Sequence, residues 1–163
     1  MTLIRPALFA LMATALSPMA SAQVLQEKNL PLTIAADIAQ QAVQICLAEG
    51  YNVTAAVVDR SGTLRALMRA DNAAPHTVNA AQRKAYTSAS TRNLTSTVAD
   101  NIQKNPAASQ LAAVEGFLVL AGGAPIKAGN EVIGAVGVGG APGGQLDEAC
   151  ALKAIEKVQA KLK

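Results

Sequence analysis

The stretch that decides the fold is VTAAVVDRSGTLRALMR, which occupies residues 53–69. Its first part, Val53 to Asp59, is rich in β-branched residues and is predicted to form a strand. Arg60-Ser61-Gly62 then turns the chain, and Thr63 to Arg69 alternates in character like a returning strand. Because so short a turn joins antiparallel strands, these residues predict a β-hairpin.

Outward from the hairpin, hydrophobic periodicity and capping residues predict helices on both sides. One helix precedes it, with Thr33 as its N-cap and Gly50 at its end. Three further helices are expected: one at 77–90, one from Thr95 to a point before Pro106, and one that begins at about Leu146. Short strands are expected at 117–120, 125–127 and 132–138. Strand and helix do not alternate in this order. It therefore predicts an α+β fold, a single antiparallel sheet flanked by helices, rather than a doubly wound parallel sheet.

The first segment has the features of a signal peptide rather than of folded structure. Arg5 gives a positive start, an apolar run follows at 7–16, and Ala20-Ser21-Ala22 is a small-residue cleavage pattern. A core helix or a membrane anchor is the alternative, but the apolar run is far shorter than the ~20 residues that cross a bilayer. We predict a signal peptide over 1–22, a single domain over 23–163, and a periplasmic or secreted protein without stable membrane insertion after cleavage.

Composition narrows the classes of partner. The formal net charge is only +3 and the basic residues are scattered, which argues against nucleic-acid binding. Aromatic residues make up 2% of the chain and charged residues 15%, so the core is predicted to consist of small aliphatic side chains. The low charge content favours burial of further surface in a homo-oligomer.

Two cysteines, Cys46 and Cys150, allow two interpretations. In an oxidising compartment an even number of cysteines favours a disulfide, which here would join the first helix to the last. The alternative is a pair of buried thiols that act as small hydrophobic residues. The sequence leaves this choice open.

Glycine clusters are the strongest local signal for a ligand. They are Gly122-Gly123 and the run from Gly139 to Gly144, which contains Gly140 and leads into a helix. Glycine lets a ligand or another backbone approach closely, and a helix start presents free N–H groups to anions. Neither cluster has the spacing of a dinucleotide-binding or P-loop motif. Ligand contact and close strand packing both remain as explanations.

Three side chains are candidates for binding an anionic or metal-containing ligand. His76 is the only histidine, which excludes zinc sites built from several histidines, and it is the obvious imidazole for a haem iron. Its alternative role is that of a residue at the start of a helix. Arg83 and Lys84, with Tyr86 close by, are expected on one polar part of the second helix, where they would meet an anion or form a solvated face.

Together these segments resemble the GlcG/HbpS family, also called the haem-degrading domain family. The resemblance spans about residues 32–160 and rests on AVVD at 56–59 with Gly62, AQRKAYTSA at 81–89, GGAPI at 122–126, and VIGAVGVGGA at 132–141 before Asp147-Glu148. It implies a central antiparallel sheet in profilin-like layers and assembly into dimers or larger rings. Secreted members bind haem, some degrade it or take part in redox sensing, and a related domain forms the C-terminal part of the corrinoid adenosyltransferase PduO.

Carried onto this chain, the resemblance implies an exported haem-binding protein that acts in haem handling or redox sensing. The implied partner is haem or another small anionic ligand. The expected cofactor-binding residues are His76, Arg83, Lys84, Gly122, Gly123, Gly139 and Gly140, with His76 as the iron ligand. Two alternatives stay open: an enzyme, either a peroxide-dependent haem degrader or a catalyst on a small organic acid, and a non-catalytic structural oligomer.

Overall fold

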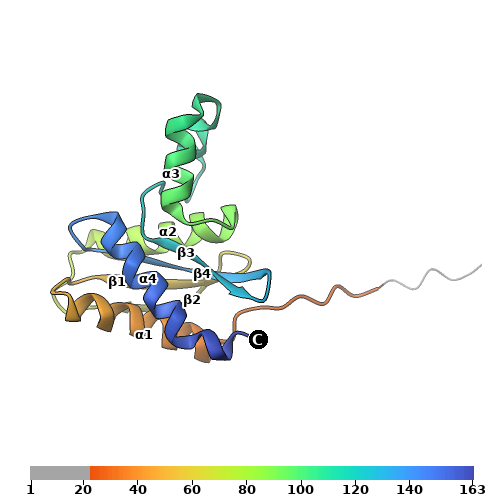
Figure 1. Cartoon of the computed structure of the whole chain (residues 1–163), viewed down its shortest axis with the longest axis horizontal. Coiled ribbons are helices and arrows are strands. Elements are labelled where there is room, and N and C mark those ends of the chain that lie inside the picture. Colours follow the sequence, from red (N-terminus) through yellow and green to blue (C-terminus); the bar gives the residue numbers. More distant parts are fainter. Residues whose placement is uncertain (1–22) are drawn as a thin grey trace, which may run out of the picture.

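The computed structural model describes residues 23–163 and contains one four-stranded antiparallel sheet with the strand order β2-β1-β4-β3 (Figure 1). The elements are α1 (Leu32–Ala48), β1 (Thr54–Asp59), β2 (Leu64–Arg69), α2 (His76–Thr91), α3 (Thr95–Lys104), the 3₁₀ helix η1 (Pro106–Ala113), β3 (Gly123–Ala128), β4 (Glu131–Gly139), α4 (Gly144–Val158) and the 3₁₀ helix η2 (Gln159–Lys161). The predicted α+β class is confirmed. The predicted signal peptide over 1–22 lies outside the described residues.

The hairpin at 53–69 forms as the sequence indicates. Strands β1 and β2 pair antiparallel from Thr54 opposite Arg69, and Gly62 takes a φ of +79° in the turn between them. Strand β1 is central and wholly buried, whereas β2 lies at the edge of the sheet and is largely exposed. The hairpin therefore places one buried strand and one accessible strand beside each other.

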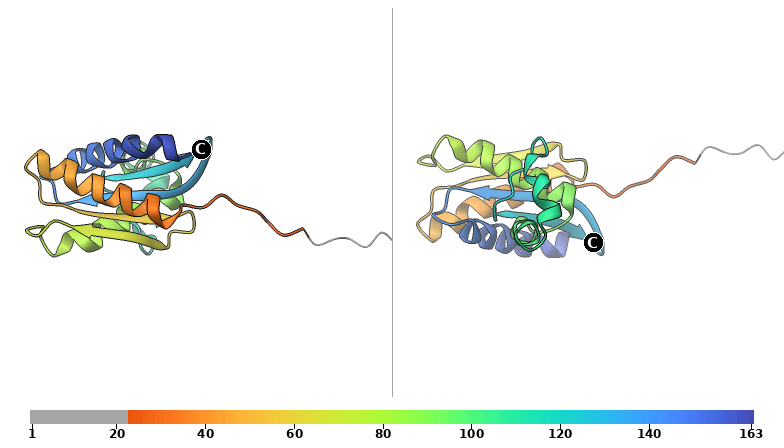
Figure 2. Two further views of the ribbon diagram at one scale, coloured as in Figure 1. Left: turned by 90° about the horizontal axis from the view of Figure 1, so that it is seen from below. Right: turned by 90° about the horizontal axis from the view of Figure 1, so that it is seen from above.

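Helices cover both faces of the sheet (Figure 2). Helices α1 and α4 lie side by side on one face, where the main core of aliphatic residues sits between them and the strands. Helix α2 covers the other face over β1 and β4, with a second, smaller cluster made of Val58, Ala85, Ala89 and Ala135. Alanine dominates this second contact, so helix and sheet approach closely.

Helix α2 begins at His76, one residue before its predicted start, and two other helix starts also differ from the prediction. The first helix begins at Leu32 and not after Thr33, because the carbonyl of Pro31 already accepts the Ala35 N–H at 3.0 Å. The last helix begins at Gly144 rather than near Leu146. In both cases the helix extends into residues that have no favourable capping side chain.

The strand predicted at 117–120 is wrong. These residues form no strand, and only two strands, β3 and β4, lie between α3 and α4. The physical reason is that side chains of α2 occupy the backbone groups a strand would use. Arg83 donates to the carbonyl of Phe117, and the Leu118 N–H donates to the hydroxyl oxygen of Thr87 at 2.8 Å.

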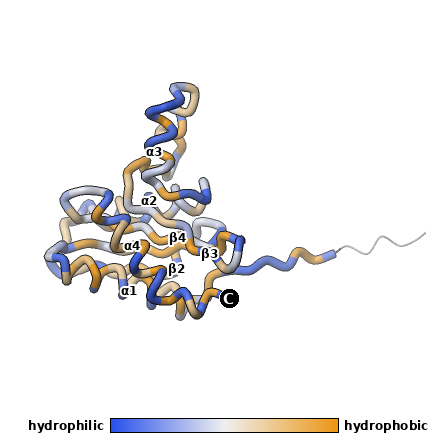
Figure 3. The backbone as a smooth tube through the Cα atoms, viewed as in Figure 1, coloured by the Kyte–Doolittle hydropathy of each residue, from blue (hydrophilic) through white to orange (hydrophobic). Residues whose placement is uncertain are grey.

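Helix α3 and η1 form an arm that stands away from the sheet (Figure 1). Only Thr95 and Val98 of α3 are buried, and η1 has no buried residue. Hydrophilic residues are interspersed along the arm (Figure 3). Among the described helices, the arm included, none combines the length and the apolar composition needed to cross a bilayer.

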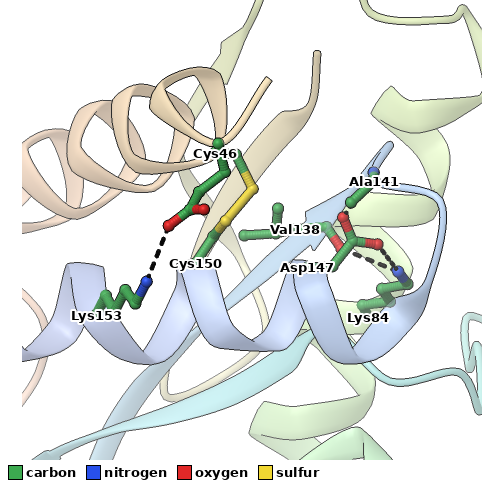
Figure 4. Close-up of a disulfide and its surroundings, with 8 residues drawn as sticks. Cys46, Lys84, Val138, Ala141, Asp147, Cys150 and Lys153 are labelled. Atoms are coloured by element: carbon green, nitrogen blue, oxygen red, sulfur yellow. Dashed lines mark hydrogen bonds and ion pairs between the residues drawn. A yellow bond between two sulfur atoms is a disulfide. The ribbon is translucent and has the colours of Figure 1, made fainter. Parts of the chain in front are cut away.

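A disulfide joins Cys46 of α1 to Cys150 of α4 and decides the question that the sequence left open. The two Cα atoms lie 5.7 Å apart, within the usual range for a disulfide. Both residues belong to the main core. Figure 4 shows the disulfide between the two helices. The bond closes most of the domain into one loop.

Candidate functional site

The described residues form an open pocket on the α2 side of the sheet, beside the turn between β1 and β2. Its volume is about 400 Å³, within the range of small-molecule sites. It is lined by Val58, Gly62, Leu64, Gln82, Arg83, Tyr86, Glu115 and Gly116. The sequence thus folds three separate segments, the hairpin, helix α2 and residues 115–116, around one cavity.

Helix α2 supplies the polar groups of this pocket. Arg83 and Tyr86 are three residues apart and therefore neighbours on one helix face. Thr87, on the next turn, donates its hydroxyl proton to the carbonyl of Arg83 at 2.8 Å and accepts from the Leu118 N–H. Together with the Arg83–Phe117 hydrogen bond, these contacts hold the 115–118 segment against α2 as one wall of the pocket.

The ring of Tyr86 lies in a slot between two glycines. An added Cβ at Gly62 would lie 2.7 Å from Cδ2 of the ring, and one at Gly116 would lie 3.1 Å from Cε1 on the opposite edge. Both glycines have positive φ, +79° and +81°, which side chains other than glycine rarely adopt. Phe117 packs edge-on to Tyr86, with ring centroids 6.1 Å apart. The slot fixes the ring, while Tyr86 as a whole remains 38% exposed.

The pocket combines an apolar floor with a few polar groups. Val58 and Leu64 supply aliphatic surface from the hairpin, and Leu64 is itself exposed. Arg83 supplies a cation, Glu115 a carboxylate and Tyr86 a phenol. A ligand with a flat apolar body and one anionic edge matches such a lining. Within residues 23–163 no group of three or more His, Cys, Asp or Glu side chains is arranged to hold a bare metal ion.

His76 lies apart from this pocket. It is the first residue of α2, is exposed, and is not among the pocket's lining residues. Arg83 follows it by about two helical turns, or ~10 Å along the axis. Of the predicted ligand-binding side chains, only Arg83 lines the pocket.

The expectation that Lys84 shares a polar surface with Arg83 is wrong. Lys84 is 2% exposed, and its Nζ donates to Asp147 Oδ2 at 2.8 Å and to the Val138 carbonyl at 3.0 Å (Figure 4). The other carboxylate oxygen of Asp147 accepts the Ala141 N–H. Burial raises the pKa of Asp147 above its usual value, and the Lys84 ammonium only partly offsets this. The pair joins α2, β4 and the start of α4, so it serves the fold.

The predicted glycine segments pack against protein atoms. A Cβ at Gly123 would lie 2.6 Å from the Thr95 side chain, and one at Gly122 would lie 2.8 Å from Lys84 Nζ. Gly139 faces the Ala80 and Ala81 turn of α2, and Gly140, with a φ of +136°, faces the Asn52 carbonyl. Close packing of the described residues takes up the space beside Gly122, Gly123 and Gly140, whereas a Cβ at Gly139 would meet only ordinary van der Waals distances.

Sequence reasoning missed that Gly62, Gly116 and Glu115 gather around Tyr86. The signal for the helical part was present, because the spacing of Arg83 and Tyr86 puts both on one face of the helix. No local pattern connects the hairpin turn with residues 115–116, which are distant in sequence. Only the tertiary structure brings these residues together.

Comparison with known proteins finds one family model that matches most of the chain. The model of the family described as "Haem degrading protein HbpS-like" matches residues 30–156. No curated protein sequence matches the chain. Residues and fold thus agree on one family description.

Solved structures agree with the family model. A double mutant of HbpS from Streptomyces reticuli is 35% identical, with a TM-score of 0.80, and the alignment covers 89% of this chain and 99% of that one. The Klebsiella pneumoniae protein ORFY is 26% identical, with a TM-score of 0.75 and coverage of 86% and 98%. A complex of PduOC with haem, 21% identical with a TM-score of 0.70 and coverage of 79% and 94%, shares the fold.

Proposed function

This chain belongs to the family of HbpS-like haem degrading proteins, and from that premise we propose that it binds haem in the pocket beside Arg83. The observation that carries the proposal is the lining of this pocket. Haem is a flat apolar macrocycle with anionic propionates on one edge. Leu64, which is 45% exposed, offers apolar surface to the ring above the buried Val58, and Arg83 offers a guanidinium to a propionate.

The residues present fit haem. The guanidinium of Arg83 uses one N–H on the Phe117 carbonyl and, with five donors in total, has others for a carboxylate. The open side of the pocket suits a large ring of which one edge remains in solvent. When bound, haem supplies a redox-active iron; the protein supplies the apolar surface, the cation and the fixed orientation.

We also propose that the protein is exported and works in the periplasm or outside the cell, as a homo-oligomer. The disulfide between Cys46 and Cys150 supports an oxidising compartment, since such bonds are rare in the cytosol. An exposed apolar side chain on the edge strand that lies outside the pocket lining, Met68, supports contact with a second copy. N-terminal sequencing of the exported protein, with Gln23 expected first, and native mass spectrometry test these two points.

A hemin titration followed by absorbance tests haem binding. The protein starting at Gln23 is expected to develop a Soret band with a saturable 1:1 stoichiometry per chain. Arg83→Gln is expected to weaken binding about tenfold, which corresponds to ~1.4 kcal/mol for one partly exposed charge-assisted contact. Arg92→Gln, at the exposed end of the same helix, is the matched control and should bind like the wild type. A wild-type protein that develops no Soret band would overturn the proposal.

The family description favours haem degradation as a second candidate function. It predicts that the Soret band of the loaded protein decays on addition of peroxide, with release of iron. A matched sample of hemin bound to serum albumin sets the rate expected without catalysis. Decay no faster than in that sample would leave binding without degradation.

A further inference from the structure

We propose that the phenol oxygen of Tyr86, which would release its proton to solvent on binding, is the protein ligand of the haem iron. This inference rests on the proposed haem-binding function and assigns the iron contact within the same pocket. It replaces His76, the imidazole that the sequence singled out, with a residue that lies in the cavity. Two features of the molecule point to this residue, the donors that line the pocket and the way in which two glycines hold the Tyr86 ring.

The pocket contains few groups that haem iron accepts from proteins. Known protein ligands of haem iron are the imidazole of His, the thiolate of Cys, the thioether of Met and the phenolate of Tyr. Among the lining residues of this cavity, Tyr86 alone belongs to that set. The two cysteines are joined in the core on the opposite face of the sheet. His76 is exposed at the start of α2, outside the lining.

The slot holds the Tyr86 ring by its two edges, while Tyr86 as a whole is 38% exposed. Gly62 approaches Cδ2 and Cε2 on one edge, and Gly116 approaches Cδ1 and Cε1 on the other. A ring held along both edges loses little further side-chain entropy when its oxygen binds a ligand. A preorganised donor of this kind is suited to hold a metal.

Arg83 and Tyr86 have the relative placement that one amphiphilic ligand requires. They are neighbours on one face of α2, with Cβ atoms expected ~5–6 Å apart. Both line the cavity whose floor is Val58 and Leu64. A macrocycle lying on that floor would have its iron against the phenol and an anionic edge against the guanidinium. One helix face would thus fix both the depth and the orientation of the ring.

Spectroscopy of the hemin-loaded protein tests this assignment. The wild type is expected to give a high-spin ferric spectrum with a phenolate-to-iron charge-transfer band and tyrosinate modes in resonance Raman. Tyr86→Phe is expected to lose both signals while it still binds hemin through Arg83 and the apolar floor. Tyr86→His is expected to replace them with the spectrum of imidazole-ligated haem, which a purely structural tyrosine would not produce.

Two control variants make the result decisive. Tyr51→Phe removes the hydroxyl of a tyrosine that packs against the core on the other face of the sheet, and it should leave the spectrum unchanged. His76→Ala should also leave it unchanged. Circular dichroism and urea unfolding of each variant show whether the fold is intact.

Three outcomes distinguish the ligand assignment from the binding proposal. Loss of the tyrosinate signals in Tyr86→Phe alone supports the assignment. A Tyr86→Phe spectrum identical to the wild type, or a change of ligation in His76→Ala, overturns it while haem binding stands. Absence of a Soret band in the wild-type protein overturns the binding proposal and the assignment together.

Discussion

Single residues on helix α2 have opposite roles although they are adjacent in sequence. Arg83 lines the open pocket, and Lys84 is buried against Asp147 on the inner side of the helix. Successive residues of an α-helix point about 100° apart, so adjacent cations cannot share a surface when one of them faces the sheet. One residue is therefore a candidate for ligand binding, and the other is part of the core.

Removal of one member of the buried pair is expected to be costly. Lys84→Met leaves the Asp147 carboxylate buried without its partner and should lower the free energy of unfolding by about 3–5 kcal/mol. The double variant Lys84→Met with Asp147→Leu should recover part of this loss, because apolar replacements remove both desolvation penalties, but should stay about 1–3 kcal/mol below the wild type since the Ala141 N–H loses its acceptor. Urea unfolding measures all three proteins.

An exposed ion pair provides the control for this experiment. Lys153 and Glu49 are 3.2 Å apart, with side chains 55% and 53% exposed. Lys153→Met should cost less than ~1 kcal/mol, as is usual for exposed pairs. A cost for Lys84→Met as small as this would mean that water reaches the Lys84 site.

The titration of Asp147 predicts a pH dependence of stability. Burial raises the pKa of Asp147 in the folded protein above 3.8, so over the pH interval above that value the folded chain keeps a proton that the unfolded chain has lost. The Asp147 contribution to stability is therefore complete below about pH 4 and declines as pH rises through the folded pKa. The free energy of unfolding of the wild type minus that of Asp147→Asn should become smaller as the pH rises from 4 to 7, because only the wild type loses the Asp147 contribution. An increase would show that attraction to Lys84 outweighs burial.

At the scale of elements, glycine determines how closely α2 packs on β4. A Cβ at Gly137 would collide with the Ala81 carbonyl oxygen and the Ala85 nitrogen of α2. Gly139 of β4 faces the side chain of Ala80, which lies on the preceding turn of α2. Glycine on the strand and alanine on the helix bring backbone against backbone. This contact holds α2, and with it the pocket, at a fixed height above the sheet.

Gly137→Ala tests the close approach of these two elements. The methyl group meets backbone atoms that cannot rotate away, so helix and strand must separate, at a cost of about 3 kcal/mol in the free energy of unfolding. Gly143→Ala is the control, because Gly143 has an extended φ of −142° and its Cβ would lie 3.7 Å from the nearest atom. It should change stability by no more than ~0.5 kcal/mol. Equal effects of the two substitutions would remove close packing as the reason for Gly137.

At the scale of the whole molecule, one disulfide links the first long helix to the last. Cys46 and Cys150 are separated by 104 positions, so the bond constrains most of the unfolded chain. The exposed arm formed by α3 and η1 lies within this loop and makes few contacts with the sheet. The bond thus strengthens the layered body formed by the sheet and its covering helices.

Loss of the disulfide is expected to cost about 4–5 kcal/mol, since the chain-entropy model gives ~4.7 kcal/mol for a loop of about a hundred residues. The double variant Cys46→Ala with Cys150→Ala should unfold at a lower urea concentration than the wild type. A reducing agent should lower the wild-type midpoint toward that of the variant and leave the variant itself unaffected. A wild-type midpoint that does not respond to full reduction would show that the bond contributes nothing to stability.

Local sequence by itself determined the four long helices, the hairpin at 53–69 and the α+β class, because periodicity, β-branched runs and turn residues act over a few neighbours. The four motifs between residues 56 and 141 also led to the family. Tertiary structure alone decided that Lys84 turns inward, that residues 117–120 give their backbone groups to Arg83 and Thr87, and that Cys46 meets Cys150. It also decided that Gly62 and Gly116 enclose Tyr86. The reason is physical: each of these contacts joins residues that are distant along the chain, and the space between them is defined only when helices and sheet have packed.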